Sequence, residues 1–190
     1  SIGGGLTMTN GGSLWVYSGV TNEALPDYGA LVTVTGAMSM APDSWVYPYS
    51  NPTNGGSALF RLGDLLIMSN AGFNADSTGN TTTNAFVRKG YQYESGPGRG
   101  FGGSYGPGAG HGGQGGACTG PAAGGPTNGS PVAPVGPGSG GGKIVTAPYQ
   151  TGGSGGGAVR IEAADVMIYG TLRASGSFPV QTSYGGGGAG

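Results

Sequence analysis

Short apolar runs, separated by glycine and polar residues, recur along the chain. They occupy residues 13–17, 30–40, 57–69, 158–163 and 165–175. The runs are rich in Val, Ile, Leu, Thr and aromatic residues and are bounded by turn-forming residues, which is typical of β-strands. No stretch carries an apolar stripe of helical period over ten or more positions, so the pattern predicts an all-β protein with essentially no helix.

Side chains within the runs alternate between apolar and polar. Val32 and Val34 alternate with threonines, and Ile161 lies between Arg160 and Glu162. Successive side chains of a strand point to opposite faces of a sheet. The alternation therefore predicts one buried face and one solvent face, with both charges of the last run in solvent.

The runs also resemble one another as units: a glycine pair, a strand, turn residues and a second strand. The glycine pairs are Gly11-Gly12, Gly55-Gly56 and Gly155-Gly156, and Asp64 and Asp165 occupy equivalent turn positions. Similar units that bury an apolar face only by stacking on each other are typical of solenoids. The pattern favours a parallel β-solenoid-like stack, and an antiparallel sandwich, which would show more regular hairpin signals, is the alternative.

A long glycine-rich tract interrupts the strand units. Residues 96–157 hold 26 glycines in 62 positions, and parts of the tract keep a three-residue period. That period is also the period of the polyproline-II helix, and collagen is excluded because glycine does not hold every third place. We expect an ordered, polyglycine-II-like insertion, with a flexible linker as the alternative. The expected division is β-strand repeats over 1–87, the glycine-rich insertion over 88–157, and a returning β-repeat with a glycine-rich tail over 158–190.

Composition narrows the functional class. Glycine supplies 47 of 190 residues, and only 8% are charged, with seven Lys+Arg against eight Asp+Glu. This balance leaves no basic surface for nucleic acid, and no apolar run is long enough for a membrane span. One Cys and one His exclude a disulfide scaffold and a Cys/His zinc site. We expect no metal and no cofactor, and an extracellular or cell-surface location. Because glycine loses the most backbone freedom on folding, we also expect ordering to be coupled to assembly.

The tract and the strand pair that follows it resemble a known class of repeats. The residues that carry the likeness are Gly100 to Gly116, Gly138 to Gly142, and the run Gly155-Gly-Gly-Ala-Val-Arg-Ile-Glu-Ala163 with Gly170 to Gly176. They resemble the glycine-rich β-helix repeats of very large secreted surface and matrix proteins of bacteria and protists. The tract also resembles the polyglycine-II bundles of phage tail-fibre adhesins and glycine-rich antifreeze proteins. The resemblance implies a parallel β-helix in an extracellular setting and names no activity.

Several motifs of enzymes occur in the tract without their structural context. Ser104 and Ser154 each lie in a Gly-x-Ser-x-Gly string, and Gly98-x-Gly100-x-x-Gly103 matches a dinucleotide fingerprint. Both motifs need a strand before them and a helix after them. We therefore expect no enzymatic activity. Cys118 is expected to be a small buried residue, and His111 to point outward.

Two kinds of candidate site remain. Asn80 and Asn128 begin sequons for N-glycosylation. Trp45, Tyr47 and Tyr49 form a dense aromatic cluster that could stack on sugar rings, or could form a loop over the end of the stack or a contact with another subunit.

These observations favour a structural role. The sequence predicts a subunit or segment of an extracellular fibre, sheath or surface matrix, whose partners are copies of itself or similar repeats, with covalent or bound glycans. The alternative is a cell-surface adhesin, a glycan-binding module that uses the aromatic cluster.

Overall fold

The computed structural model describes residues 1–9, 11–21, 28–77, 96–102, 105–118, 122–130, 132, 135–143 and 151–179. Over these residues it contains nine strands and no helix, which confirms the expected all-β class. The strands are β1 (Leu6–Met8), β2 (Ser13–Tyr17), β3 (Ala30–Met40), β4 (Trp45–Tyr49), β5 (Ala58–Ile67), β6 (Gly72–Asn74), β7 (Arg160–Glu162), β8 (Asp165–Ile168) and β9 (Thr171–Arg173).

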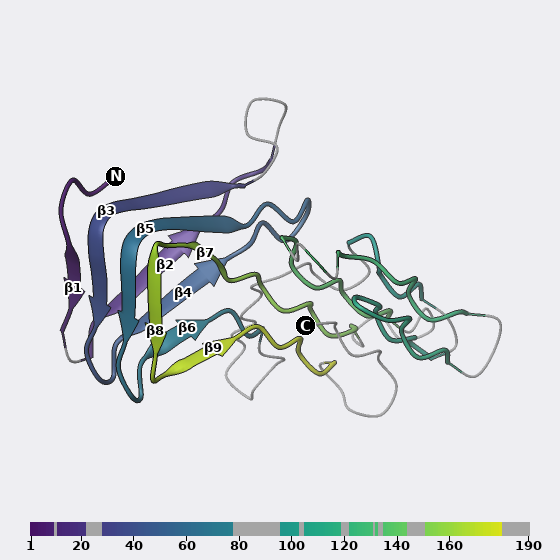
Figure 1. Ribbon diagram of the computed structural model, residues 1–190. Coiled ribbons are helices and arrows are strands. Elements are labelled where there is room, and N and C mark those ends of the chain that lie inside the picture. The colour runs from purple at the N-terminus through teal and green to yellow at the C-terminus, as the bar shows by residue number, and fades with distance from the viewer. Residues whose placement is uncertain are drawn as a thin grey trace.

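The strands form two sheets in which every pairing is parallel. The first sheet has the order β1-β3-β5-β7, with β8 also paired to β5, and the second has the order β2-β4-β6-β9. Each pass of the chain adds a strand to the first sheet and then one to the second (Figure 1). We call this arrangement of β1–β9 the strand stack. Its parallel pairing rules out the antiparallel sandwich for these residues.

The strands of the first sheet bend partway along their length (Figure 1). The register between β3 and β5 shifts between Val34 and Ala37, beside Gly36. A Cβ atom at Gly63, on β5, would lie 2.8 Å from the carbonyl oxygen of Thr35. Glycine at this position therefore lets the two backbones approach closely where the strand changes direction.

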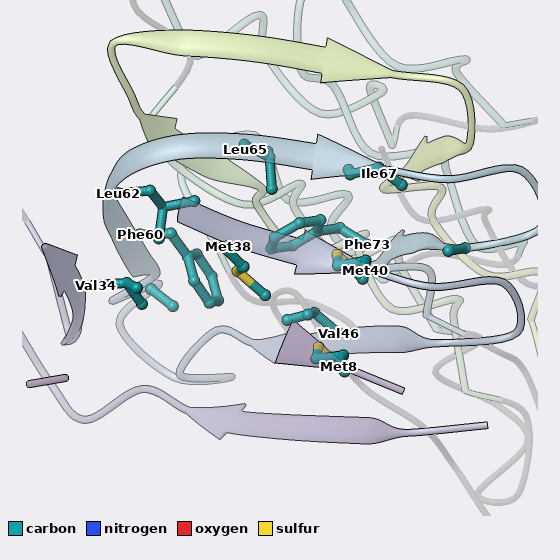
Figure 2. Packing of buried hydrophobic residues seen from close by; sticks show 12 residues of the cluster. Met8, Val34, Met38, Met40, Val46, Phe60, Leu62, Leu65, Ile67 and Phe73 are labelled. Atoms are coloured by element: carbon teal, nitrogen blue, oxygen red, sulfur yellow. The ribbon is translucent and has the colours of Figure 1, made fainter. Parts of the chain in front are cut away.

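Apolar side chains from both sheets meet in one core. Phe60 from the first sheet packs edge-to-face on Phe73 from the second, with ring centroids 5.1 Å apart at 85°. Met38, Met40 and Ile67 are completely buried beside them (Figure 2). The inward side chains of paired strands lie next to one another and form continuous rows through the core. This agrees with the alternation of apolar and polar residues.

The corner between the two sheets repeats from one pass to the next. Asp43 and Asn70 both adopt the left-handed conformation, with φ of 65° and 58°, and Gly11 has φ 77° between β1 and β2. Asp and Asn tolerate this region better than most side chains. The amide of Asp43 donates to the carbonyl of Asn70 at 3.0 Å, and the Asn70 side chain donates to the Asp43 carboxylate.

Backbone hydrogen bonds connect the segments of the glycine-rich region, which we call the glycine-rich bundle (the described residues between 96 and 157). Gly138 and Gly141 donate to Gly156 and Gly153, each at 2.9 Å. Gly142, next in the chain, donates to Pro107 instead, at 2.9 Å. Positions three apart thus face one neighbouring segment while an adjacent position faces another. Among its described residues, the tract therefore forms backbone hydrogen bonds to more than one neighbouring segment.

The bundle packs at distances that only glycine allows. A Cβ atom at Gly155 would overlap the carbonyl of Gly138, and one at Gly124 would overlap the carbonyl of Gly115. By contrast, a Cβ at Gly116 would meet no atom within 4 Å. The glycines at the close contacts therefore have a packing role that composition alone does not identify.

The bundle is joined to the strand stack by direct hydrogen bonds. Gly157 donates its amide to the carbonyl of Ala75, just beyond β6, at 2.7 Å. The hydroxyl of Ser57, before β5, donates to the carbonyl of Val135 at 2.9 Å. Figure 1 shows the bundle, in green, beside the stack, on the side from which the chain enters β7.

Two sequence-based expectations about the strands differ from the structure. The strand after Gly11-Gly12 was expected to match the strand after Gly55-Gly56, but β2 pairs with β4 in the second sheet whereas β5 lies in the first. Strands of both sheets contain the same kinds of apolar residues, so their composition does not distinguish them. Asp64 and Asp165 are equivalent, as expected, because they are register partners between β5 and β8, but neither lies in a turn: Asp64 is inside β5 and Asp165 begins β8.

Candidate functional site

The outer face of the second sheet carries an aromatic surface. On β2, Leu14 and Val16 pack against the core, which turns Trp15 and Tyr17 outward, 53% and 70% exposed. On β4, Val46 is completely buried, so the residues on either side of it face outward. We define the aromatic surface as the outward aromatic residues of these two strands: Trp15, Tyr17, Trp45, Tyr47 and Tyr49.

Parallel register places the rings of neighbouring strands against each other. Trp15 is the register partner of Tyr47, and their ring centroids are 5.5 Å apart with an interplanar angle of 16°. Tyr17 is the partner of Tyr49, at 4.7 Å and 26°. Stacked rings at these separations attract one another beyond the area that they bury.

Trp45 has different neighbours from the other four rings. Its register partners are Ser13 on β2 and Gly72 on β6. It is also half-buried, so it contributes less accessible ring surface than Trp15 does.

The phenol of Tyr49 titrates differently from an isolated tyrosine. Burial of the ring raises its pKa above the ordinary value of 10.0, and the neighbouring phenols of Tyr17 and Tyr47 raise it further. Burial disfavours the charged phenolate, and so does the approach of another phenolate. The Tyr49 phenol therefore remains protonated and neutral at physiological pH.

An ion pair connects β9 to the segment just beyond β6. Arg173 donates from Nη2 to Oδ2 of Asp76 at 2.7 Å, and the amide of Ser175 donates to Oδ1 of the same carboxylate at 2.7 Å. Only 9% of the Asp76 side chain is exposed. This carboxylate, with both oxygens engaged, joins the chain segments of the last two passes.

The structure places the predicted aromatic cluster Trp45, Tyr47 and Tyr49 in a strand, so the alternative of a loop over the stack is wrong. The residues from Trp45 to Tyr49 are a paired strand rather than a loop, because Val46 and Pro48 fill the core. The sequence analysis missed Trp15 and Tyr17. The alternation Trp15-Val16-Tyr17, which matches Trp45-Val46-Tyr47, is the signal that could have identified them.

Of the two sequon asparagines, the structure describes only Asn128. Asn80 lies outside the described residues. Asn128 is half-buried in the glycine-rich bundle, and its Nδ2 donates to the carbonyl of Gly110 at 2.7 Å. The same residue donates its backbone amide to the carbonyl of His111 at 3.0 Å. Its side-chain nitrogen, the atom that would carry a glycan, therefore takes part in the packing of the bundle.

The other chemically notable residues lie apart from the aromatic surface. His111 is half-buried and lines a hollow of about 390 Å³ between the bundle and the strand stack, with Leu172 and Arg173 on the opposite side. Cys118, expected to be buried, is only half-buried, and its Sγ lies 3.6 Å from the carbonyl of Ala122. Ser154 is buried, and Ser104 lies outside the described residues.

Within the part of the chain that the structure describes, no three His, Cys, Asp or Glu residues gather to hold a metal ion. Over the same residues, no helix has the length and apolar character needed to cross a membrane. No protein-family model, curated protein or solved structure matches the chain.

Proposed function

We propose that the chain is a structural subunit or segment of an extracellular fibre, sheath or surface matrix. In this proposal the strand stack is a parallel β-solenoid, the glycine-rich bundle is a polyglycine-II-like insertion, and copies associate end to end. Three kinds of observation support it: the repeated passes through two parallel sheets, the close backbone packing of the bundle, and the uncovered ends of the stack.

The strongest support for end-to-end association is the exposed apolar surface at β8 and β9. The inward row of β5 is buried, with Leu65 2% and Ile67 0% exposed. Their register partners Val166 and Ile168 belong to the same row, yet they are 50% and 42% exposed. Leu172, the partner of buried Phe73, is 44% exposed. The core therefore continues to the end of the stack, where the described residues provide no further pass to cover it.

The opposite end offers a matching surface. The terminal strands there are β1 and β2, whose inward residues include Leu6, Leu14 and Val16, all partly buried against the core. A second copy that presented this end to β8 and β9 would continue both sheets, satisfying the backbone groups of the edge strands. Because the two contacting surfaces differ, such a head-to-tail contact repeats without closing and produces a filament.

An assembly experiment on the full chain tests this proposal. Val166→Lys places a charge in the exposed inward row, while Met167→Lys, at a residue 53% exposed on the outward face of the same strand, is the matched control. Burying an unpaired charge is costly, so we expect Val166→Lys to raise the concentration needed for filaments by about tenfold or more, which corresponds to about 1.4 kcal/mol. Met167→Lys should assemble like the wild type.

Electron microscopy and sedimentation over a concentration series provide the measurement, and circular dichroism checks that both variants fold. The proposal fails if the wild-type chain stays a monodisperse monomer at high concentration. It also fails if folded Val166→Lys and Met167→Lys assemble equally well.

A glycan-binding adhesin is the second candidate, and the aromatic surface favours it. The surface is larger than the sequence predicted, and Trp15 and Tyr17 are both more than half exposed. An aromatic ring with an accessible face can pack against the apolar C–H face of a sugar ring, which excludes water from both surfaces. Binding on a glycan array that is lost in both Trp15→Ala and Trp45→Ala would support this function. No binding by the folded wild-type chain would reject it.

A further inference from the structure

The stacked pair Tyr17 and Tyr49 places two phenols together on the solvent side of the second sheet. The residues are register partners of adjacent parallel strands, their ring centroids are 4.7 Å apart, and Tyr17 is 70% exposed. The hydrogen-bonded register between β2 and β4 holds this spacing, so the two rings are neighbours whenever the second sheet is formed.

We propose that Tyr17 and Tyr49 form an oxidative cross-linking site, at which hydrogen peroxide and a haem peroxidase join the two rings as dityrosine. Each phenol loses one electron and its hydroxyl proton, which gives a phenoxyl radical with spin density on the ring carbons next to the C–O bond. The two radicals combine through a carbon–carbon bond between these ortho positions. Each coupled carbon then loses its hydrogen as the phenol is restored. The two tyrosines together lose two hydrogen atoms, and one hydrogen peroxide is reduced to two waters.

The arrangement of the rings favours this pair. Coupling needs two radicals in contact, and a fixed neighbour provides a far higher effective concentration than diffusion does. Tyr47, the next outward residue along β4, stacks on Trp15 instead of on a tyrosine. Tyr169 is 65% exposed, and among the described residues no aromatic ring stacks on it. Exposure alone therefore allows oxidation at several tyrosines, whereas the geometry directs coupling to one pair.

The product would be a covalent link between two successive passes of the strand stack. It would join β2 to β4 and close a loop that contains β3, the central strand between β1 and β5 in the first sheet. A cross-link that closes a long loop restricts the unfolded chain. Both tyrosines belong to the same copy, so the link forms within one chain rather than between two copies.

The test treats the full chain with a haem peroxidase and hydrogen peroxide, at a concentration where circular dichroism shows the strands to be formed. Isotope-labelled copies mixed with unlabelled ones distinguish links within one copy from links between copies. We expect dityrosine fluorescence, and one cross-linked pair of peptides that contains residues 17 and 49 and lacks two hydrogens. Tyr17→Phe and Tyr49→Phe keep a stacked ring and should each abolish the cross-link. Tyr169→Phe, which removes an exposed tyrosine without a stacked partner, should leave its yield unchanged.

A second measurement keeps the outcome decisive. In concentrated urea the wild-type chain should lose the selectivity for residues 17 and 49, because the register no longer holds the rings together. The proposal is overturned if the folded chain yields no cross-link between residues 17 and 49. Equal dityrosine in folded Tyr17→Phe, or coupling at Trp15 in place of Tyr17, would overturn it as well.

Discussion

The strand stack and the glycine-rich bundle are two ordered regions with different sources of order. In the strand stack, side chains such as Phe60 and Phe73 fill a shared core, and the backbone bonds run along strands of a sheet. In the bundle, extended segments bond to several neighbours, and close backbone contacts take the place of side-chain packing. We therefore expect the strand stack to lose stability when a large side chain is removed, and the bundle to lose stability when a side chain is added at a close contact.

Removing a large side chain should affect the strand stack far more than the bundle. Phe60→Ala deletes a completely buried ring and should lower the free energy of unfolding by about 3–5 kcal/mol. Phe101→Ala, in the bundle, removes a ring that is 56% exposed and lies over the Arg99 guanidinium at 4.5 Å. It should cost less than about 1 kcal/mol. Urea unfolding followed by circular dichroism measures both, and equal losses would contradict the contrast between the regions.

Adding a single methyl group should have its large effect in the bundle. Gly155→Ala inserts a Cβ into the backbone of Gly138 and should cost about 1–3 kcal/mol as overpacking. Gly116→Ala enters open space and should be neutral, or stabilise by up to about 1 kcal/mol, since alanine restricts the unfolded chain. Thermal unfolding of the two variants provides the comparison. If both behave alike, close glycine packing does not stabilise the bundle.

The smallest predicted effect concerns alkaline stability of the strand stack. The folded-state pKa of Tyr49 lies above the ordinary value of 10.0, so the folded state holds this proton more tightly than the unfolded state does. The corresponding stability is present below pH 10.0 and is lost as the pH rises through the folded pKa. Tyr49→Phe should therefore lose less stability at alkaline pH than the wild type, by a small margin. Urea unfolding at pH values on either side of 10.0 tests this, and identical pH dependence would refute it.

The alternation of apolar and polar residues predicted the inward rows correctly but was wrong in two details. Arg160 is half-buried, and the successive residues Leu59 and Phe60 of β5 are both buried, so both faces of that strand are covered at this point. Ile161 packs against the core, while the Glu162 side chain is exposed and forms an ion pair with Arg61 at 2.7 Å between Nε and Oε2. The pairing of Asp64 with Asp165 also followed from the sequence, because both begin the second half of a first-sheet strand. Local patterns were sufficient for these features, since strand periodicity is a property of a few consecutive residues.

The membership of the aromatic surface was harder to predict. Trp45, Tyr47 and Tyr49 were visible as a cluster in the sequence, but Trp15 and Tyr17 lie an entire pass away along the chain. Aligning the two Trp-Val-Tyr strings would place Trp15 against Trp45, whereas the structure pairs Trp15 with Tyr47. The register between two parallel strands depends on the length and path of the chain that connects them. It therefore cannot be predicted from the residues of either strand alone.

The sequence by itself determined the all-β class, the strand faces and the presence of an exceptional glycine-rich tract, because each depends on local composition or on a two-residue period. Only the tertiary structure decided which strands share a sheet, which rings stack, and which glycines touch another backbone. Gly155 and Gly116 illustrate the point: they are the same residue in similar surroundings of sequence, yet one faces the carbonyl of Gly138 and the other faces open space. Whether a glycine lies against another backbone depends on segments that are distant in the chain. Because glycine has no side chain, the sequence contains no polar or apolar pattern that would predict this contact.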